Sequence, residues 1–329
     1  MESKNKTVSV VMCTYNGAKY IREQLDSIVR QTYPVLELII QDDGSTDETR
    51  NILDEYKAKY PYISVYHNNP PKGINGNFIS CIRRAKGDYI AISDQDDIWE
   101  IDKLAVQIEQ IGDRMFSSGF SKPFTAEEGK IHFDERRPNC AAERFIYVGA
   151  LPGHTQLIRK DFIDKIPNVD YWLQYILYDH LFQVVAACYG SISFCDKVLV
   201  NQRRHSASAT NTKPLNYAVS IKNVFLSIKR TWSLYRELRP KMRMYFSRIY
   251  ELLSSLPEEA AYKSDAQKMA YYQSQASFAA YIRLTCLCVK CRHRIFYSDE
   301  RFKGSRILRA LYFPISCSDY FRGMSEKQF

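Results

Sequence analysis

The chain has 329 residues, of which 45% are hydrophobic and 25% charged; this composition excludes collagen-like, coiled-coil and largely disordered proteins and indicates about two folding units. No stretch reaches the ~18 uninterrupted apolar residues that a membrane span needs, because Arg283 interrupts the best candidate, 277–289. The net charge of +9 is concentrated in residues 211–329, where 21 Lys and Arg stand against 9 Asp and Glu, a balance that suits nucleic acid, an anionic membrane or a phosphorylated ligand.

The first hundred residues predict strands that alternate with helices. Apolar and β-branched runs predict strands at 7–13, 36–40, 63–66 and 89–93, and helical spacing predicts helices at 20–29, around 52–56 and at 77–85. We expect Ser45 or Thr46 to cap the second helix. This order predicts an α/β fold with a mostly parallel sheet and helices on both faces, in which ligands bind beyond the carboxyl ends of the strands.

The rest of the chain is less regular. The pattern predicts loops or short helices at 112–144, a helix at 173–187, and paired short strands at 191–195 and 197–201. After residue 211 the pattern is helical, with breaks expected at Pro240, Pro257 and Pro314. The nine scattered cysteines predict free thiols, and a polar N-terminus that leads into only six apolar residues predicts a cytoplasmic protein without a signal peptide.

An acidic cluster follows the fourth predicted strand. Asp94, Asp96 and Asp97 would repel one another unless a positive charge compensates them, and Mg²⁺ or Mn²⁺ held together with substrate phosphates would do so. The alternative is a helix N-terminus, where acids are favoured and where Ile98 and Trp99 would begin the next helix. The position at the end of a strand favours the metal.

A second acidic pair, Asp42 and Asp43, follows the second predicted strand. One of these carboxylates could accept the imide N–H of a pyrimidine base or a ribose hydroxyl, and the other could be structural. The same residue types also build Asx turns and helix caps. The sequence does not divide these roles between the two residues.

Three segments make the chain similar to a known family: VSVVMCTYNGAKYIREQLDSIVRQTYP, ELIIQDDGSTDET and GDYIAISDQDDIW. Over about the first 210 residues the chain resembles the family 2 inverting glycosyltransferases of the GT-A fold, and in particular the rhamnosyltransferase-like branch of bacterial surface polysaccharide synthesis. The resemblance implies a GT-A catalytic domain at 1–210, followed by a helical basic region at 211–329.

The resemblance also implies roles for individual residues. The nucleotide-binding positions are Thr14, Tyr15, Asn16, Asp42, Asp43 and Asp94, and the metal-binding positions are Asp96, Asp97 and His205. The positions near the donor or acceptor sugar are Trp99, Gly153, His154, Thr155 and Arg204, and the catalytic base is Asp179. His154 is a departure from the family, whose members more often have Cys or Asn there.

The chemistry of these residue types agrees with such roles. A sugar hydroxyl is a poor nucleophile near neutral pH, so a carboxylate such as Asp179 would accept its proton, and the surrounding apolar residues would raise the basicity of that carboxylate. A cation at Asp96 and a donor at His205 or Arg204 would stabilise the leaving diphosphate. With the base and the leaving group on opposite faces of the sugar, the configuration inverts. The alternatives are a surface aspartate and ordinary hydrogen-bonded histidines.

The C-terminal third supports two interpretations. Basic residues alternate with apolar ones at 222–230, 236–248 and 301–309, as in amphipathic helices on anionic lipid, but a helical bundle with a solvated basic face would look the same. Cys286, Cys288, Cys291 and His293 lack the second ligand pair of a usual zinc site, and on a helix most of them would point in different directions.

We therefore predict a metal-dependent inverting glycosyltransferase that uses Mg²⁺ or Mn²⁺ and transfers rhamnose from dTDP-rhamnose to a glycan acceptor linked to polyprenyl diphosphate. Its expected place is the cytoplasm or the cytoplasmic face of the inner membrane, and no nucleic acid partner is expected. One alternative is a donor such as UDP-galactose, UDP-glucose or a UDP-N-acetylhexosamine. A nucleotidyltransferase would need a glycine-rich phosphate loop with a lysine, which residues 14–17 do not provide. The last alternative is a non-catalytic membrane or nucleic-acid binding protein with a degenerate core.

Overall fold

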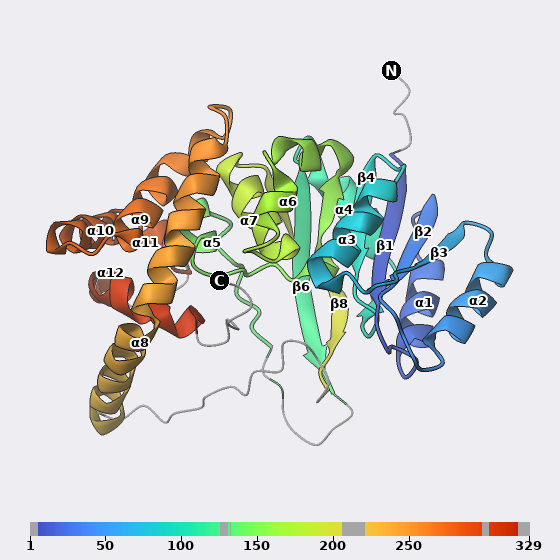
Figure 1. Cartoon of the computed structure of the whole chain (residues 1–329), viewed down its shortest axis with the longest axis horizontal. Helices are drawn as coiled ribbons and strands as arrows, with labels where there is room; N and C mark the ends of the chain where they lie inside the picture. The colour runs from blue at the N-terminus through green and yellow to red at the C-terminus, as the bar shows by residue number, and fades with distance from the viewer. Residues whose placement is uncertain (1–5, 126–130, 132, 206–220, 298–302, 322–329) are drawn as a thin grey trace.

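The protein is described by a computed structural model over residues 6–125, 131, 133–205, 221–297 and 303–321 (Figure 1). Its centre is an eight-stranded sheet in the order β3-β2-β1-β4-β7-β6-β8-β5. The strands are β1 (Val8–Thr14), β2 (Glu37–Asp42), β3 (Ile63–His67), β4 (Tyr89–Ser93), β5 (Ile98–Trp99), β6 (Phe116–Phe124), β7 (Leu157–Arg159) and β8 (Ile192–Arg203). Strands β3, β2, β1 and β4 are mutually parallel, as are β6 and β8, whereas β7 and β5 run antiparallel to their neighbours.

Helices cover both faces of this sheet and form the whole C-terminal part of the described chain (Figure 1). The α-helices are α1 (Ile21–Val29), α2 (Thr49–Lys59), α3 (Gly73–Arg84), α4 (Lys103–Ile111), α5 (Ala142–Phe145), α6 (Val169–Trp172), α7 (Tyr178–Cys188), α8 (Ile221–Ser255), α9 (Ser264–Ser274), α10 (Phe278–Lys290), α11 (Arg292–Ile295) and α12 (Lys303–Ser316). Short 3₁₀ turns lie at Gly153–Thr155, Lys160–Lys165, Ala261–Lys263 and Cys317–Phe321.

The predicted α/β fold and its first four strands are confirmed. Alternate residues of β1 point to opposite faces: Val10 and Met12 join the apolar core under α1, α2 and α4, while Val11 joins the core under α3 and α7. Because both faces of the strand are buried, its sequence is a continuous apolar run. The carboxyl ends of β1, β2 and β4 lie side by side and present their polar residues at one edge.

Two local predictions near this edge are wrong. Ser45 and Thr46 do not cap α2, which begins only at Thr49, because the Ser45 hydroxyl instead donates to the Asp42 carboxylate. Ile98 and Trp99 do not begin a helix but form β5, paired antiparallel with β8. The antiparallel pairing with Asn201 and Val200 of β8 outweighs the helix-start signal of the preceding acids.

The middle of the chain also differs from its prediction. Residues 116–124, expected to be loop, form β6, and the two short strands expected after residue 190 are one strand, β8, which pairs parallel with β6 through a register shift at Gly119 and Phe120. Gly119 is required at this shift, since a Cβ there would lie 2.6 Å from Leu199 Cδ1. The tertiary pairing with β8 therefore defines a strand that has little β-propensity of its own.

The C-terminal helices pack against the sheet region through a shared apolar core. Phe145 of α5 and Leu181 of α7 belong to the same buried cluster as Phe246 and Leu252 of α8. Two of the predicted breaks are wrong, because Pro240 and Pro314 lie inside α8 and α12, whereas Pro257 follows the end of α8 as expected. The packing of buried residues such as Met242 and Phe246 outweighs the missing N–H at Pro240.

Polar contacts add to this packing. Arg294 of α11 forms an ion pair with buried Glu143 of α5, with 2.8 Å between Nη1 and Oε1, and Arg144 donates to the Ile295 carbonyl oxygen at 2.8 Å. The predicted domain boundary at residue 210 lies outside the described residues. None of the described helices is both long and apolar enough to cross a lipid bilayer.

Candidate active site

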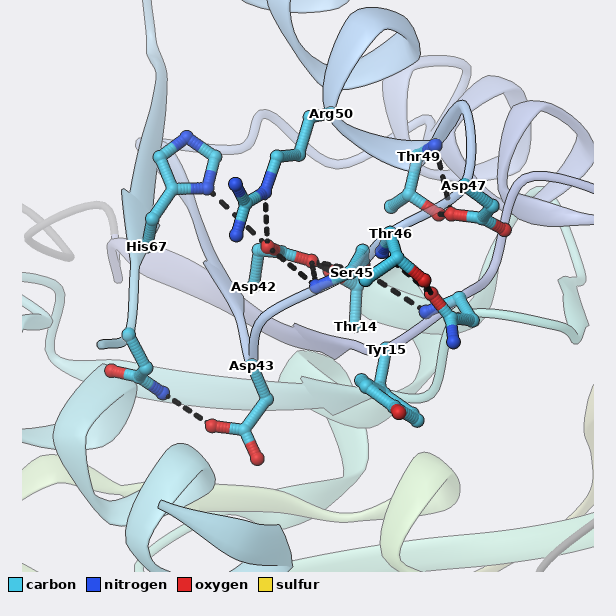
Figure 2. A network of polar contacts seen from close by, with 12 residues as sticks. Thr14, Tyr15, Asp42, Asp43, Ser45, Thr46, Asp47, Thr49, Arg50 and His67 are labelled. Carbon is cyan, nitrogen blue, oxygen red and sulfur yellow. Dashed lines mark hydrogen bonds and ion pairs between the residues drawn. The ribbon is translucent and has the colours of Figure 1, made fainter. Parts of the chain in front are cut away.

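Asp42, at the end of β2, is fully buried and holds together the loop that follows it (Figure 2). Its carboxylate accepts hydrogen bonds from the Ser45 hydroxyl and amide and from Arg50 Nε at 3.0 Å, and Thr14 Oγ1 lies 3.2 Å from Oδ1. Burial alone would raise the pKa of Asp42, but these hydrogen bonds outweigh it and lower the pKa. All these contacts are internal, so the carboxylate acts as a structural anion.

Asp43, the next residue, points away from this network toward a cavity (Figure 2). It accepts hydrogen bonds from Asn68 Nδ2 at 2.8 Å and from the amides of Lys72 at 2.7 Å and Gly73 at 2.9 Å. The side chain of Tyr15, which is 57% exposed, lies at the rim of the same cavity. The structure thus separates the two carboxylates that the sequence left undivided: Asp42 is buried and Asp43 faces the cavity.

The cavity has a volume of about 630 Å³ and lies at the carboxyl edge of β1, β2 and β4. It brings together residues from five segments of the sequence. Of the residues predicted for the site, those that line it are Thr14, Tyr15, Asn16, Asp43, Asp94, Asp96, Asp97, Arg204 and His205. The convergence of polar strand ends at one edge is therefore present in the structure.

Buried His154 lies between two carboxylates of the acidic cluster. Its Nδ1 is 3.2 Å from Oδ2 of Asp94 and 3.2 Å from Oδ2 of Asp97, and its Nε2 is 2.8 Å from the Ser121 hydroxyl. Burial lowers the pKa of the imidazole, but Asp97 and Asp94 outweigh this effect and raise it. Burial raises the pKa of Asp97 to about 7. Asp97 therefore changes between its protonated and charged forms near neutral pH.

Asp96 forms a separate pair with His205, whose Nε2 lies 2.9 Å from Oδ2. Burial and the charge of Asp94 raise the pKa of Asp96, against the opposing effect of the histidine. The backbone of this loop is held by Arg203, which donates from Nε to the Asp96 carbonyl at 3.0 Å and from its amide to Asp97 Oδ1 at 2.9 Å. The late Arg-Arg-His segment thus closes over the acidic cluster.

The predicted metal residues Asp96, Asp97 and His205 are consequently divided between two groups. Asp94, Asp97 and His154 place their ligand atoms within 4.8 Å of one another, whereas Asp96 and His205 contact each other. Asp97 Oδ2 is buried and, among the described residues, receives no hydrogen bond. The two carboxylates suit Mg²⁺ or Mn²⁺, so Asp94 and Asp97 fit a divalent cation, and Asp97 belongs both to the predicted metal residues and to this group.

Asp179 lies in the first turn of α7, in a partly exposed position. Burial raises its pKa to about 6, the charge of Asp94 adds to this effect, and the His180 amide and His154 oppose it. Asn75 of α3 fixes the start of α7 by accepting from the Tyr178 amide at 2.9 Å and donating to the Ile176 carbonyl. Gly153 lies against the same turn, and a methyl group there would collide with the Tyr178 hydroxyl.

Of the five residues predicted near the sugar, only Arg204 lines the cavity; Trp99, Gly153, His154 and Thr155 do not. Trp99 is only 3% exposed and belongs to the apolar core, where its ring packs against Lys103, and it is not among the residues that line the cavity. Thr155 is fully buried, with its hydroxyl 2.6 Å from that of Ser118. Strand pairing of β5 turns Trp99 inward, a direction that the sequence pattern did not specify.

Two residues that were not assigned a role hold the site together. Gln95 donates to the Tyr15 carbonyl at 3.0 Å and accepts from the Tyr15 amide at 2.9 Å, which ties the loop after β1 to the acidic loop. Arg203 ties α1 and β8 to the same loop. Gln95 lies inside the quoted segment GDYIAISDQDDIW and Arg203 lies two residues before His205, so their position beside the acids and His205 was the available signal.

The cysteine cluster of the C-terminal region does not form a metal site with His293. Cys286 is exposed while Cys288 and Cys291 are buried, and His293 Nδ1 lies 3.2 Å from Arg306. Cys291 does lie near Glu143 and Asp265, but these carboxylates are already paired with cations, Asp265 with both Lys290 and Arg294. This group is an ion-pair network between helices.

Comparisons with known proteins agree with this arrangement. The model of glycosyl transferase family 2 matches residues 9–166. TuaG of Bacillus subtilis (strain 168), a glycosyltransferase assigned to teichuronic acid biosynthesis, is 28% identical over 247 residues, which are 73% of this chain and 90% of TuaG. The dTDP-rhamnosyl transferase RfbG of Shigella flexneri is 33% identical over 158 residues, which are 46% of this chain and 54% of RfbG.

The fold is similar to that of S. aureus TarS residues 1–349, solved in complex with UDP-GlcNAc. The TM-score is 0.54 and the identity 18%, over 96% of this chain and 89% of that one. At this identity the likeness concerns the fold, which is the GT-A fold. The match to the family model and the sequence relatives show that the chain belongs to glycosyltransferase family 2.

Proposed function

We propose that this enzyme transfers a sugar from a nucleoside diphosphate sugar to a glycan acceptor with inversion, assisted by a divalent cation. The observation that carries the proposal is the position of Asp179. This carboxylate lies in the first turn of α7, within the electrostatic reach of Asp94 and His154, and its pKa is raised to about 6. A base with this pKa is charged at neutral pH and is also a better proton acceptor than an ordinary aspartate.

In the proposed reaction, Asp179 accepts the proton of the acceptor hydroxyl while the oxygen attacks the anomeric carbon. The bond between this carbon and the diphosphate breaks on the opposite face. Attack opposite to the leaving group inverts the configuration in a single displacement. Gly153 lets its 3₁₀ turn pack closely against the first turn of α7, because a Cβ there would collide with the Tyr178 hydroxyl.

The leaving diphosphate gains negative charge, and the acidic loop would meet it. Asp94, Asp97 and His154 would hold the cation, with Asp96 and His205 beside them. A bound Mg²⁺ or Mn²⁺ would neutralise charge on the leaving group. Arg204 and His205, which line the cavity, would donate hydrogen bonds to phosphate oxygens.

The nucleotide would occupy the part of the cavity near β1 and β2. Tyr15 offers an exposed ring for a base, and Asp43 offers a carboxylate at the same end of the cavity. Rhamnose from dTDP-rhamnose is the first choice of donor, because RfbG is named a dTDP-rhamnosyl transferase and is 33% identical over 158 residues. UDP-hexoses and UDP-N-acetylhexosamines are the alternative donors.

The acceptor would be a growing surface glycan, as the name of TuaG suggests for that relative. Assembly on polyprenyl diphosphate would place the acceptor at the cytoplasmic face of a membrane. In this proposal, residues 1–210 form the catalytic domain and residues 211–329 contribute to binding of the acceptor.

The test is transfer by the Asp179→Asn variant. We expect the rate of transfer to fall about 10²–10⁴-fold while the affinity for the donor changes little, because the variant loses the base but not the nucleotide site. Asp170→Asn, an exposed carboxylate paired with Arg83, is the matched control and should transfer at the normal rate. Normal transfer by Asp179→Asn would remove Asp179 from the role of base.

Two further measurements complete the test. EDTA should stop transfer, with Mg²⁺ or Mn²⁺ restoring it; a rate that EDTA leaves unchanged would refute the cation. Calorimetric titration with a panel of dTDP- and UDP-sugars identifies the donor, and tighter binding of a UDP-sugar than of dTDP-rhamnose would overturn the first choice.

A further inference from the structure

Three helices of the C-terminal region expose large apolar side chains. They are Ile228 and Trp232 of α8, Phe278 and Ile282 of α10, and Leu308 and Leu311 of α12, and we call this set the docking face. Phe278 is 77% exposed and Leu308 70%, values that are unusual for such residues. A group of this kind marks an interaction site more often than an isolated exposed apolar residue does.

Contacts between the helices make the docking face continuous. Trp232 and Phe278 line the same cavity, of about 350 Å³, together with Tyr235 and Pro314. The Tyr312 hydroxyl of α12 donates to the Ile228 carbonyl oxygen of α8 at 3.4 Å. Leu308 and Leu311 lie within one turn of Tyr312, and Ile282 lies one turn after Phe278.

The same helices are strongly basic. Segments 228–239, 278–290 and 303–316 contain nine Lys and Arg and a single acid, Glu237. Exposed cations lie next to the exposed apolar side chains along each helix: Lys229, Arg230, Arg236, Arg239, Arg283 and Arg309. An anionic partner is therefore favoured electrostatically, and the apolar side chains must also be covered by it.

We propose that the docking face binds the surface of an anionic lipid bilayer. An acidic polysaccharide or a nucleic acid would use the cations and could stack on Trp232, but it would leave aliphatic side chains such as Leu308 and Ile282 in water. A bilayer satisfies both kinds of group: the apolar side chains enter the boundary between headgroups and acyl chains, and the cations contact lipid phosphates. The rings of Trp232 and Phe278 suit this boundary.

The position of the docking face agrees with a membrane-borne acceptor. The first half of α8 and α12 lie toward the lower side of Figure 1, to which β6 and β8 also run, so this is the side of the carboxyl edge of the parallel strands. A protein bound through the first half of α8 would have the carboxyl edge of its strands, whose residues line the cavity, on the side of the bilayer. Only this link between the orientation on the membrane and the acceptor rests on the proposed function; the binding to lipid is independent of it.

The test is co-sedimentation of the full chain with two sets of vesicles, pure phosphatidylcholine and a mixture that contains phosphatidylglycerol. We expect binding to the anionic vesicles alone, with affinity that falls steeply as salt increases. Trp232→Ala combined with Phe278→Ala should weaken binding at least about tenfold, and Lys229→Gln or Arg236→Gln about fivefold each. Thermal unfolding of each variant verifies that it is folded.

Matched controls separate this face from a general surface effect. Ile101→Ala removes an apolar side chain that is 58% exposed in the catalytic part, and Lys57→Gln removes an exposed cation of α2; both should bind like the unmodified chain. If the variant with both Trp232→Ala and Phe278→Ala bound anionic vesicles as tightly as the unmodified chain, the proposal would be overturned. Tighter binding of the chain to a soluble acidic polysaccharide than to vesicles would also overturn it. So would a dimer of the unmodified chain, detected by analytical sedimentation, that the same two substitutions dissociate.

The outcome is independent of the donor chemistry. Donor affinity, measured in the absence of vesicles, should be unchanged in the docking-face variants. Vesicle binding without donor binding would contradict the proposed function alone, and donor binding without vesicle binding would contradict the docking face alone.

Discussion

The guanidinium of Arg203 lies over the ring of Tyr20, 4.6 Å from its centroid, and the ring of Phe124 lies 4.7 Å away from the same guanidinium. From this position Arg203 reaches three partners: Glu23 of α1 at 2.9 Å, the Asp96 carbonyl and Asp97. Only 9% of its side chain is exposed. Arg203 therefore connects α1, β6 and the acidic loop, and fixes where the carboxylates of that loop point.

We predict that Arg203→Lys weakens binding of the donor in the presence of Mn²⁺ about tenfold without unfolding the protein. A lysine keeps the charge, but it has no planar group that can stack on the aromatic rings. It also cannot donate to Glu23 and to the Asp96 carbonyl oxygen at the same time in the geometry of the guanidinium. Isothermal titration measures the affinity. Glu23→Gln is the control, because this carboxylate is 55% exposed and its ion pair contributes at most about 1 kcal/mol. Unchanged affinity in Arg203→Lys would show that the loop holds its shape without this contact.

The separation of Asp42 from Asp43 leads to a second prediction. Asp42→Asn should lower the free energy of unfolding by about 3 kcal/mol, because it removes the partner of Arg50 and of the Ser45 hydrogen bonds in a fully buried position. Asp43→Asn should cost only about 1 kcal/mol but should weaken nucleotide binding more, because Asp43 faces the cavity. Urea unfolding and titration with UDP and dTDP measure the two effects, and the reverse ranking would contradict this assignment.

Part of the fold could be predicted from local sequence alone. In β1 the run from Val8 to Met12 is buried on both faces, so its apolar character identifies it as a central strand whatever surrounds it. In β6 the sequence FSSGFSKPF has no such signal, and its pairing with β8 depends on residues that follow it by about 75 positions. Propensity could not identify a strand whose stability comes from a distant partner.

The candidate site shows the same division. Strand ends predicted that Asp43, Asp94 and Asp97 would meet at one edge, because topology alone brings them there. Which carboxylate faces which histidine depends on side-chain direction and burial. His154 enters from a 3₁₀ turn and His205 follows β8, and no spacing in the sequence specifies that the first lies against Asp97 and the second against Asp96.

The raised pKa of Asp179 predicts the pH dependence of catalysis. The base acts as a carboxylate, so kcat at saturating donor, acceptor and Mn²⁺ should rise with pH and level off above a midpoint of about 6. The measurement needs saturating Mn²⁺, because the pKa of Asp97 is raised to about 7 and its protonation would weaken the binding of the cation. At saturation the pH profile reports the proton transfer to Asp179. Initial rates from about pH 5 to about pH 8 give the profile. A kcat that stays constant through pH 6 would exclude a base with this pKa.

Lys103 provides a prediction about stability that is independent of the reaction. Its side chain is fully buried, its ammonium donates to Gln107 Oε1 at 2.9 Å, and it lies 3.9 Å from the centroid of the Trp99 ring. Burial lowers its pKa from 10.5 to about 7. Between these two values the unfolded chain binds a proton that the folded chain does not, so this lysine makes the folded state more stable as the pH rises from about 7 toward 10.5.

We expect Lys103→Met to remove this contribution. Relative to the variant, the unmodified protein should gain about 2 kcal/mol in free energy of unfolding between about pH 7 and about pH 9, measured with urea at each pH. Any cost of leaving Gln107 Oε1 without its donor does not depend on pH and cancels in this difference. Lys57→Met, at an exposed position of α2, should follow the unmodified protein at every pH. Parallel curves for Lys103→Met and the unmodified protein would show that the buried lysine keeps its proton by reaching water.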